Sequence, residues 1–262
     1  MVKNAPEHKW TFRPRFRKGA FGWRSDTAIK RVKEAMAEIR KVARQNPVLG
    51  AEGAVIFLER VSPALEHVDS SSGAIGTAVN RAIENLVKII CNAKTDEALR
   101  DNWLDRLRAA IETDGMGYLD LLQKHWGDLC VTPERALEWA GQYSWIVRSI
   151  WTSRQTGGTY FHGIVICLSS LFKAKQYQEL LELLKHTPYN SWTYHSWGVR
   201  SLIEMERPEE ALAYVNAKWS SDSHVTEIEG IWERILTDHY PDIPPAEIPE
   251  DLIDTTPGQD GK

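Results

Sequence analysis

The sequence has no long hydrophobic run. Its apolar stretches, such as residues 164–168 (IVICL), are far shorter than the roughly 20 residues that a membrane-spanning helix needs. The first ten residues, MVKNAPEHKW, contain no apolar core of a secretory signal. We therefore expect no membrane partner and a cytoplasmic location.

Cysteine is scarce as well. The three cysteines, Cys91, Cys130 and Cys167, are widely spaced and lie within apolar helical patterns. Such a set is typical of reduced core thiols in a cytosolic protein rather than of a disulfide framework. The sequence also contains no CxxC pair and no HExxH motif. We therefore expect no metal and no cofactor, and we assign no catalytic residue.

Charge is unevenly divided along the chain, although the net charge is only −4. Residues 1–46 carry thirteen basic and four acidic side chains, a surplus of +9, and the remaining residues carry −13. A basic arm of this kind binds a polyanion such as nucleic acid, or it folds back onto the acidic body. The basic residues concerned are Arg13, Arg15, Arg17, Lys18 and Arg24. The arm also holds five aromatic residues that need a hydrophobic environment, so we favour the folded-back arm; they are Trp10, Phe12, Phe16, Phe21 and Trp23.

Apolar residues recur at helical spacing, and no segment reads convincingly as a strand. The clearest helical stripes lie within residues 29–42 and 75–90. We expect Ser25 or Asp26 to cap the first of these helices. We expect Pro63 to break or kink a helix over about 50–61, and residues 118–129 to form one short helix. The fold class is predicted to be all-α.

A repeat occupies the C-terminal half. Residues 171–184 (LFKAKQYQELLELL) match residues 202–215 (LIEMERPEEALAYV) at an offset of 31 residues. Each copy is predicted to be a helix, a polar turn and a second helix, as in stacked helical repeats. We expect four leucines at equivalent positions to be buried between paired helices: Leu171, Leu181, Leu202 and Leu212.

Four segments carry a family resemblance. They are residues 62–87 (SPALEHVDSSSGAIGTAVNRAIENLV), 118–130 (YLDLLQKHWGDLC), 160–184 (YFHGIVICLSSLFKAKQYQELLELL) and 197–217 (WGVRSLIEMERPEEALAYVNA). Together they resemble a functionally uncharacterised bacterial all-helical family whose C-terminal half is tetratricopeptide-like. The resemblance implies an all-helical fold in a bacterial cytoplasm and brings no catalytic residues. The period of 31 departs from the tetratricopeptide period of about 34.

These patterns predict four parts of the chain. Residues 1–24 form a basic aromatic arm, and residues 25–130 form an N-terminal helical bundle. Residues 131–240 form a tetratricopeptide-like helix-pair stack, closed by a capping helix at about 222–239. Residues 241–262 form a flexible tail rich in proline and acidic residues.

The most polar constellation is Glu66, His67, Asp69 and Ser72, with Ser70 and Ser71 between them. A carboxylate, an imidazole and hydroxyls together are able to hold a metal or to perform acid–base or nucleophilic chemistry. These residue types are also typical of a loop that caps the following helix, and we favour that interpretation.

Aromatic side chains offer a second candidate site. Trp192, Tyr194 and Trp197, with Tyr160 and His162, are predicted to contact a partner if they line a concave surface. The alternative is that most of these large rings fill gaps between crossing helices.

The leading functional hypothesis is a non-enzymatic helical-repeat protein that binds a protein or peptide partner as an adaptor or accessory subunit. One alternative is a nucleic-acid-associated accessory subunit that uses the basic arm. Another is an enzyme of unknown class centred on Glu66, His67 and Asp69.

Overall fold

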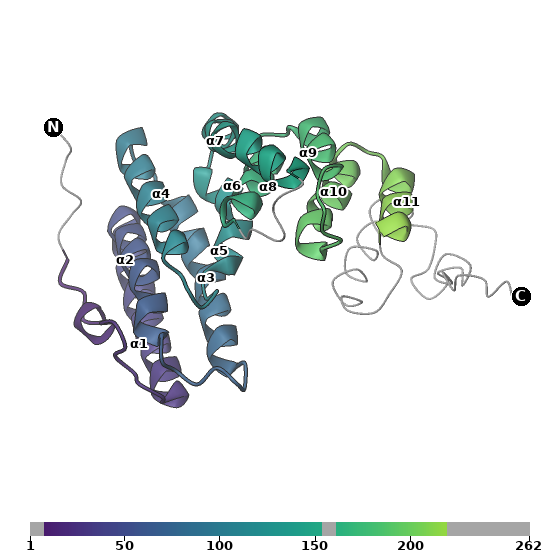
Figure 1. The fold of residues 1–262 in the computed structure, drawn as a ribbon. Coiled ribbons are helices and arrows are strands. Elements are labelled where there is room, and N and C mark those ends of the chain that lie inside the picture. The colour runs from purple at the N-terminus through teal and green to yellow at the C-terminus, as the bar shows by residue number, and fades with distance from the viewer. Residues whose placement is uncertain (1–7, 154–160, 219–262) are drawn as a thin grey trace, which may run out of the picture. The chain divides into compact units, whose positions relative to one another are not determined.

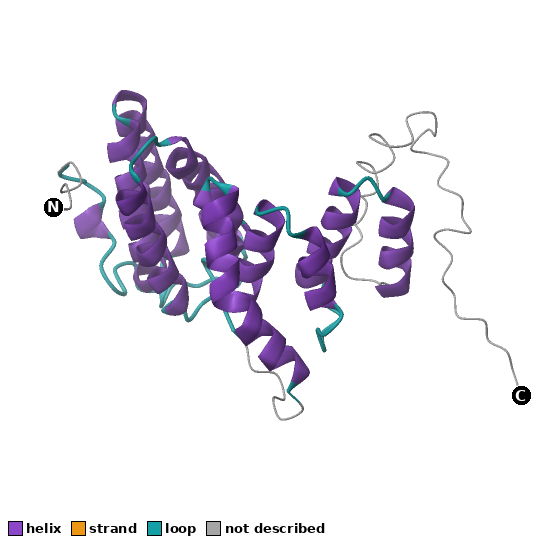
Figure 2. Cartoon of the chain, turned by 90° about the horizontal axis from the view of Figure 1, so that it is seen from above, coloured by secondary structure: helices purple, strands orange, loops and turns teal. Residues whose placement is uncertain are grey.

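The computed structural model describes residues 8–153 and 161–218, and these residues form helices and loops without a strand (Figure 2). The predicted all-α fold class is therefore confirmed over this part of the chain. In chain order the elements are η1 (Arg13–Arg15), α1 (Ser25–Gln45), α2 (Pro47–Leu65), α3 (Ala74–Asn92), α4 (Glu97–Glu112), α5 (Asp120–Lys124), α6 (Trp126–Cys130), α7 (Pro133–Thr152), α8 (Gly163–Lys173), α9 (Tyr177–Leu184), α10 (Trp192–Glu204) and α11 (Pro208–Lys218) (Figure 1). The predicted capping helix and tail lie outside the described residues.

The chain divides into two compact units. The first contains residues 8–145 and 161–174, and the second contains residues 146–153 and 175–218. The division falls inside α7, and it assigns α8 to the first unit and α9 to the second. The four-part organisation predicted above remains a prediction.

The first unit is organised around α2. Helices α1, α3 and α4 all pack against it, and α1 also packs against α3 (Figure 1). The approach of α1 to α2 is close, because a Cβ atom on Gly50 would lie only 2.4 Å from the Cβ of Ala43. A side chain at position 50 would therefore clash with α1 beside the turn that joins the two helices.

A buried carboxylate joins α2 to α4. Glu52 accepts hydrogen bonds from the indole Nε1 of Trp103 and from Nη1 of Arg106, both at 2.7 Å. Arg106 also donates two bonds of 2.8 Å to the carboxylate of Glu59, and this pairing raises the pKa of the guanidinium. A charge buried among apolar residues is tolerated because every strong acceptor in this group has a donor.

Three local predictions are wrong. Ser25 and Asp26 do not cap α1, because Arg24 occupies the cap position and no side chain bonds the first amides. The helix that contains Pro63 does not end near position 61, because α2 continues through Pro63 to Leu65; the alternative of a kink at Pro63 stays a prediction. Residues 118–129 form two short helices, α5 and α6, because the backbone leaves helical geometry at His125 (φ −93°, ψ 10°).

The described part of the arm lies against the bundle. The rings of Phe12 and Phe16 meet Phe57 of α2 edge to face, with centroids 5.9 and 5.1 Å apart. Trp10 lies over Gly53, where a Cβ atom would stand 2.2 Å from the indole. Four of the five arm aromatics are buried as expected, and Trp23 is 74% exposed. The folded-back arm is thus supported by the burial of its rings.

In the second unit, α10 packs against both α9 and α11. A small core of Trp192, Val199, Leu202, Ala211 and Val215 fills the space between α10 and α11. Of the four leucines predicted to be buried, Leu171 and Leu202 are buried and Leu181 is half-buried. The structure does not describe the side chain of Leu212.

The 31-residue offset is visible in the backbone. Helices α8 and α10 end at positions 173 and 204, and α9 and α11 begin at positions 177 and 208. In each turn one non-glycine residue adopts a left-handed conformation, with φ 57° at both Lys175 and Glu206. These two residues are also 31 positions apart, so the two helix–turn–helix segments share a turn geometry.

The contact between Trp10 and Gly53 generates a prediction. Gly53→Ala places a methyl group inside the volume of the indole, and overpacking of this kind costs about 1–3 kcal/mol of unfolding free energy. Urea unfolding measures that loss, and faster tryptic cleavage after Arg15 and Arg17 reports release of the arm. The control is Gly76→Ala in α3, whose new Cβ meets nothing within 4 Å. Equal stability and equal cleavage in the two variants would contradict the docking of Trp10 on α2.

A second prediction concerns the core of the second unit. Leu202→Ala should cost about 2–5 kcal/mol, because it removes a buried side chain between α10 and α11. Hydrogen exchange of the amides in α10 and α11 measures the effect locally. Glu204→Ala, at an exposed position of the same helix, should leave exchange nearly unchanged.

Candidate functional site

The polar residues at 66–72 lie in the turn before α3. The favoured capping interpretation is wrong, because Gly73 occupies the cap position with φ 68° and no side chain caps the helix. The carboxylate of Asp69 accepts the amide N–H of Ser71 at 3.0 Å, and this bonding lowers the pKa of Asp69. The hydroxyl of Ser72 accepts the amide of Ala74 at 3.4 Å. Glu66 forms a 3.5 Å ion pair with Lys18 of the arm. In the described part of the chain, no three His, Cys, Asp or Glu side chains are grouped to hold a metal ion.

The predicted aromatic surface is largely interior. Trp192 and Trp197 are only 2% and 4% exposed, and the guanidinium of Arg200 lies 4.5 Å from the Trp197 ring centre. Tyr194 is half-buried and faces Trp151 at 5.7 Å. These contacts give the rings a packing role, while their role in partner binding stays a prediction.

Two further residues were predicted for that surface. His162 belongs to the first unit, where its Nδ1 lies 3.5 Å from Nε2 of Gln123. The three aromatic residues above belong to the second unit. Tyr160 lies outside the described residues.

The basic residues of the arm have different environments. Arg15 pairs with Glu34 of α1 at 3.0 Å, and Lys18 pairs with Glu66. Arg13, Arg17 and Arg24 are exposed and form no ion pair within residues 8–153 and 161–218. Part of the predicted polyanion-binding set is thus neutralised by the bundle.

The cysteines are free thiols in protected surroundings. Burial raises the pKa of Cys91 to about 11 and that of Cys130 to about 12. The Sγ of Cys91 donates to the backbone oxygen of Asp128 at 3.2 Å, and Cys167 is fully buried. Because the thiolate is the nucleophile, neither Cys91 nor Cys130 is poised to react at neutral pH.

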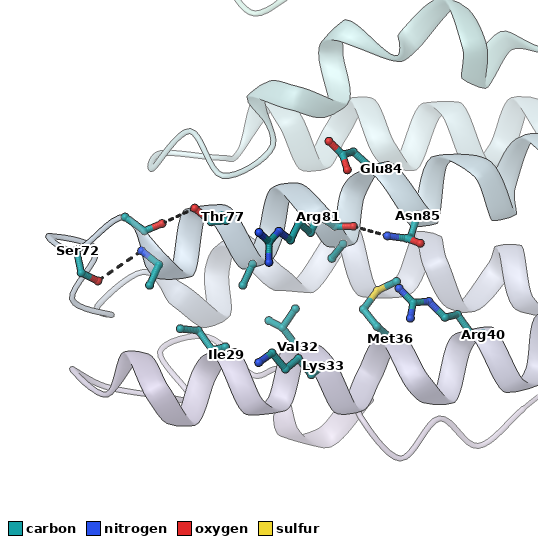
Figure 3. A pocket seen from close by; sticks show the side chains of 14 residues that line it. Ile29, Val32, Lys33, Met36, Arg40, Ser72, Thr77, Arg81, Glu84 and Asn85 are labelled. Atoms are coloured by element: carbon teal, nitrogen blue, oxygen red, sulfur yellow. Dashed lines mark hydrogen bonds between the residues drawn. The ribbon is translucent and has the colours of Figure 1, made fainter. Parts of the chain in front are cut away.

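A groove between α1 and α3 is the strongest candidate site. It has a volume of about 640 Å³, and Figure 3 shows side chains from both helices pointing into it. Its floor is aliphatic, because Ile29, Val32 and Met36 of α1 recur at helical spacing and meet Ala78 and Ala82 of α3. Val32, Met36 and Ala82 are buried, and Ile29 and Ala78 are half-buried, so these last two supply the open apolar surface of the floor.

The walls of the groove are basic. Lys33 and Arg40 extend from α1 and Arg81 extends from α3, and all three are exposed (Figure 3). Among the described residues, none of the three has a carboxylate within 4.0 Å. Glu84 is the acidic residue that lines the groove.

Two acidic residues of α1 lie on the side that contacts the arm. Glu34 of α1 pairs with Arg15 and Arg31, and Glu38 accepts the amides of Thr11 and Phe12. Both glutamates are therefore engaged on the arm side of α1. Lys33 and Arg40 face the other way and keep their charge uncompensated.

Our reading of the sequence did not single out this groove. The signal that points to it is the seven-residue spacing of Lys33 and Arg40, which places them on one stripe of α1 beside Ile29 and Met36. The surplus of +9 in residues 1–46 includes both residues, so part of this charge belongs to the groove and not to the arm.

The chain matches no known family model, and no curated protein or solved structure shows significant similarity to it. The groove therefore has to be interpreted from its own chemistry. Within the described ranges, no helix combines the length and the apolar character needed to cross a bilayer.

The protected cysteines give a prediction for native thiol chemistry. At pH 8 a thiol with a pKa near 11 is ionised in only about one molecule in a thousand. We expect a disulfide reagent such as DTNB to modify Cys91 and Cys130 slowly in the folded protein. All three cysteines should react at once in guanidinium chloride. Fast modification of either residue in the native state would show that a reactive thiol had been overlooked.

Proposed function

We propose that this protein is a non-enzymatic helical protein that binds a protein or peptide partner through the groove between α1 and α3. The observation that carries the proposal is an open groove with an aliphatic floor and three uncompensated cations on its walls. A long groove between two helices is a common way to receive a helical segment of a partner.

The chemistry of the groove supports binding more than catalysis. Its hydroxyl groups, Ser72 and Thr77, bond to backbone groups of the turn before α3 and not to a side chain that would act as a general base. The polar residues 66–72 support the turn at the end of the groove, since Ser72 and Gly73 belong to its lining. An enzyme centred on Glu66, His67 and Asp69 is therefore the weaker hypothesis.

The nucleic-acid alternative draws less support from the arm than the sequence suggested. Four arm aromatics are buried against the bundle, and Arg15 and Lys18 are paired with glutamates. A nucleic-acid contact would thus have to rely on Arg13, Arg17 and Arg24. Three exposed arginines with one exposed ring, that of Trp23, form a sparse site for a polynucleotide.

The proposal includes an adaptor role in the bacterial cytoplasm and a tetratricopeptide-like second half. The free thiols and the family resemblance support the cytoplasmic setting. The shared turn geometry of α8–α9 and α10–α11 supports the repeat. Such repeats commonly assemble proteins by offering a continuous surface.

The proposal predicts that filling the groove abolishes partner binding. Ala78→Trp introduces a large ring into the groove, and the amount of partner that co-purifies with the tagged protein from its host should fall about tenfold or more, a loss of roughly 1.4 kcal/mol. Asn80→Trp is the matched control, because it adds the same ring to an exposed position of α3 outside the groove lining. Melting curves of both variants verify that the fold is retained.

Recovery of the same partner in the same amount with Ala78→Trp would place the binding surface elsewhere. If Ala78→Trp proves unstable, Arg40→Glu provides the same test, since it alters an exposed wall position without touching the core. Its control is Arg17→Glu on the arm, which makes the same charge change outside the groove.

A further inference from the structure

From the groove between α1 and α3 we infer that the partner segment is an acidic amphipathic helix. This inference rests on the proposed function and specifies the chemistry of the occupant. It requires two complementary features in one segment, an apolar stripe for the floor and carboxylates for the walls.

The floor selects an apolar stripe. Val32, Met36 and Ala82 are buried and Ile29 is half-buried, so the base of the groove is a row of aliphatic side chains along α1 and α3. A third helix can lay its own apolar residues, repeated at three and four positions, along such a row. A fully polar segment would leave this strip without contacts.

The walls select negative charge. Lys33 and Arg40 on α1 are two helical turns apart, roughly 10 Å along the axis at 1.5 Å per residue. Arg81 stands on the opposite wall (Figure 3). Carboxylates placed two turns apart on one edge of a helix, with another on the opposite edge, would meet all three cations. Complementary charges of this kind steer a partner and fix its register.

The same observations disfavour two other occupants. No Trp, Tyr, Phe or His lines the groove, so nucleic-acid bases would find no ring for stacking, and phosphates would face an aliphatic floor and Glu84. A second copy of the chain, apposed through the same face, would bring Lys33, Arg40 and Arg81 against their own counterparts. Like charges brought together in this way repel each other, so this dimer is disfavoured.

Fluorescence anisotropy with the full chain tests the inference. The probes are three labelled peptides of about 18 residues, or five helical turns, with one leucine stripe and with Glu, Gln or Lys at the flanking positions. A labelled oligothymidylate of about 20 nucleotides is the nucleic-acid probe. We expect the Glu peptide to bind most tightly at low salt, the Lys peptide to bind most weakly, and added salt to reduce the difference.

Substitutions in the groove and on the arm show which cations bind the carboxylates of the peptide. The triple variant Lys33→Gln, Arg40→Gln, Arg81→Gln should weaken the Glu peptide on the order of tenfold while leaving the Gln peptide nearly unchanged, as expected for three exposed ion pairs. The matched control is Arg13→Gln, Arg17→Gln, Arg24→Gln, which removes the same charge from exposed arm positions and should have little effect. Ala78→Trp should weaken both peptides.

The possible results distinguish a failure of the acidic-helix inference from a failure of the proposed function. If the Gln peptide binds as tightly as the Glu peptide and Ala78→Trp weakens both, the groove binds peptides but the acidic partner is wrong. If Ala78→Trp weakens neither peptide, or no peptide binds, the inference fails, and co-purification with Ala78→Trp decides the proposed function separately. Oligothymidylate binding that the groove triple variant abolishes would replace the acidic helix with a polynucleotide.

Discussion

The close packing of α1 on α2 is the constraint on which the rest of the first unit depends. Gly50 allows the first turn of α2 to lie close to the end of α1, and Gly53, one turn further along α2, receives the indole of Trp10. Helix α2 is also held to α4 through Glu52 and Arg106. Because α1 and α3 are both positioned by contact with α2 and with each other, the groove between them has a supported floor and two defined walls.

The arm and the groove divide the charges of α1 between them. Glu34 and Glu38 contact the arm, whereas Lys33 and Arg40 line the groove on another side of the helix. The arm therefore contributes to the electrostatics of the groove without lining it. A basic N-terminal region that suggests polyanion binding in the sequence becomes, in the folded chain, a docked arm and a separate cationic surface.

The sequence predicts the positions of the helices well, but it predicts their packing against one another less well. Helical spacing identifies α1 and α3, Asn46-Pro47 marks the boundary between α1 and α2, and the 31-residue offset predicts the turns at Lys175 and Glu206. Helix α2 continues two residues past Pro63, and the backbone oxygen of Pro63 accepts the amide of Gly19 in the arm, a contact that no local pattern predicts. The burial of Trp192 depends on how α11 packs against α10. The groove depends on α1 and α3, which α2 separates in the sequence, so no local pattern encodes it.

The two left-handed turns show what is shared between the repeated segments. Lys175 and Glu206 have opposite charges, yet both adopt φ 57°. Side-chain chemistry therefore does not create this turn; it follows from how one helix ends and the next begins. A side chain in the left-handed region carries a conformational penalty of roughly 1 kcal/mol that glycine avoids. A glycine at either position would adopt the same backbone conformation without this penalty. Each turn therefore contains a residue that is less stable there than glycine would be.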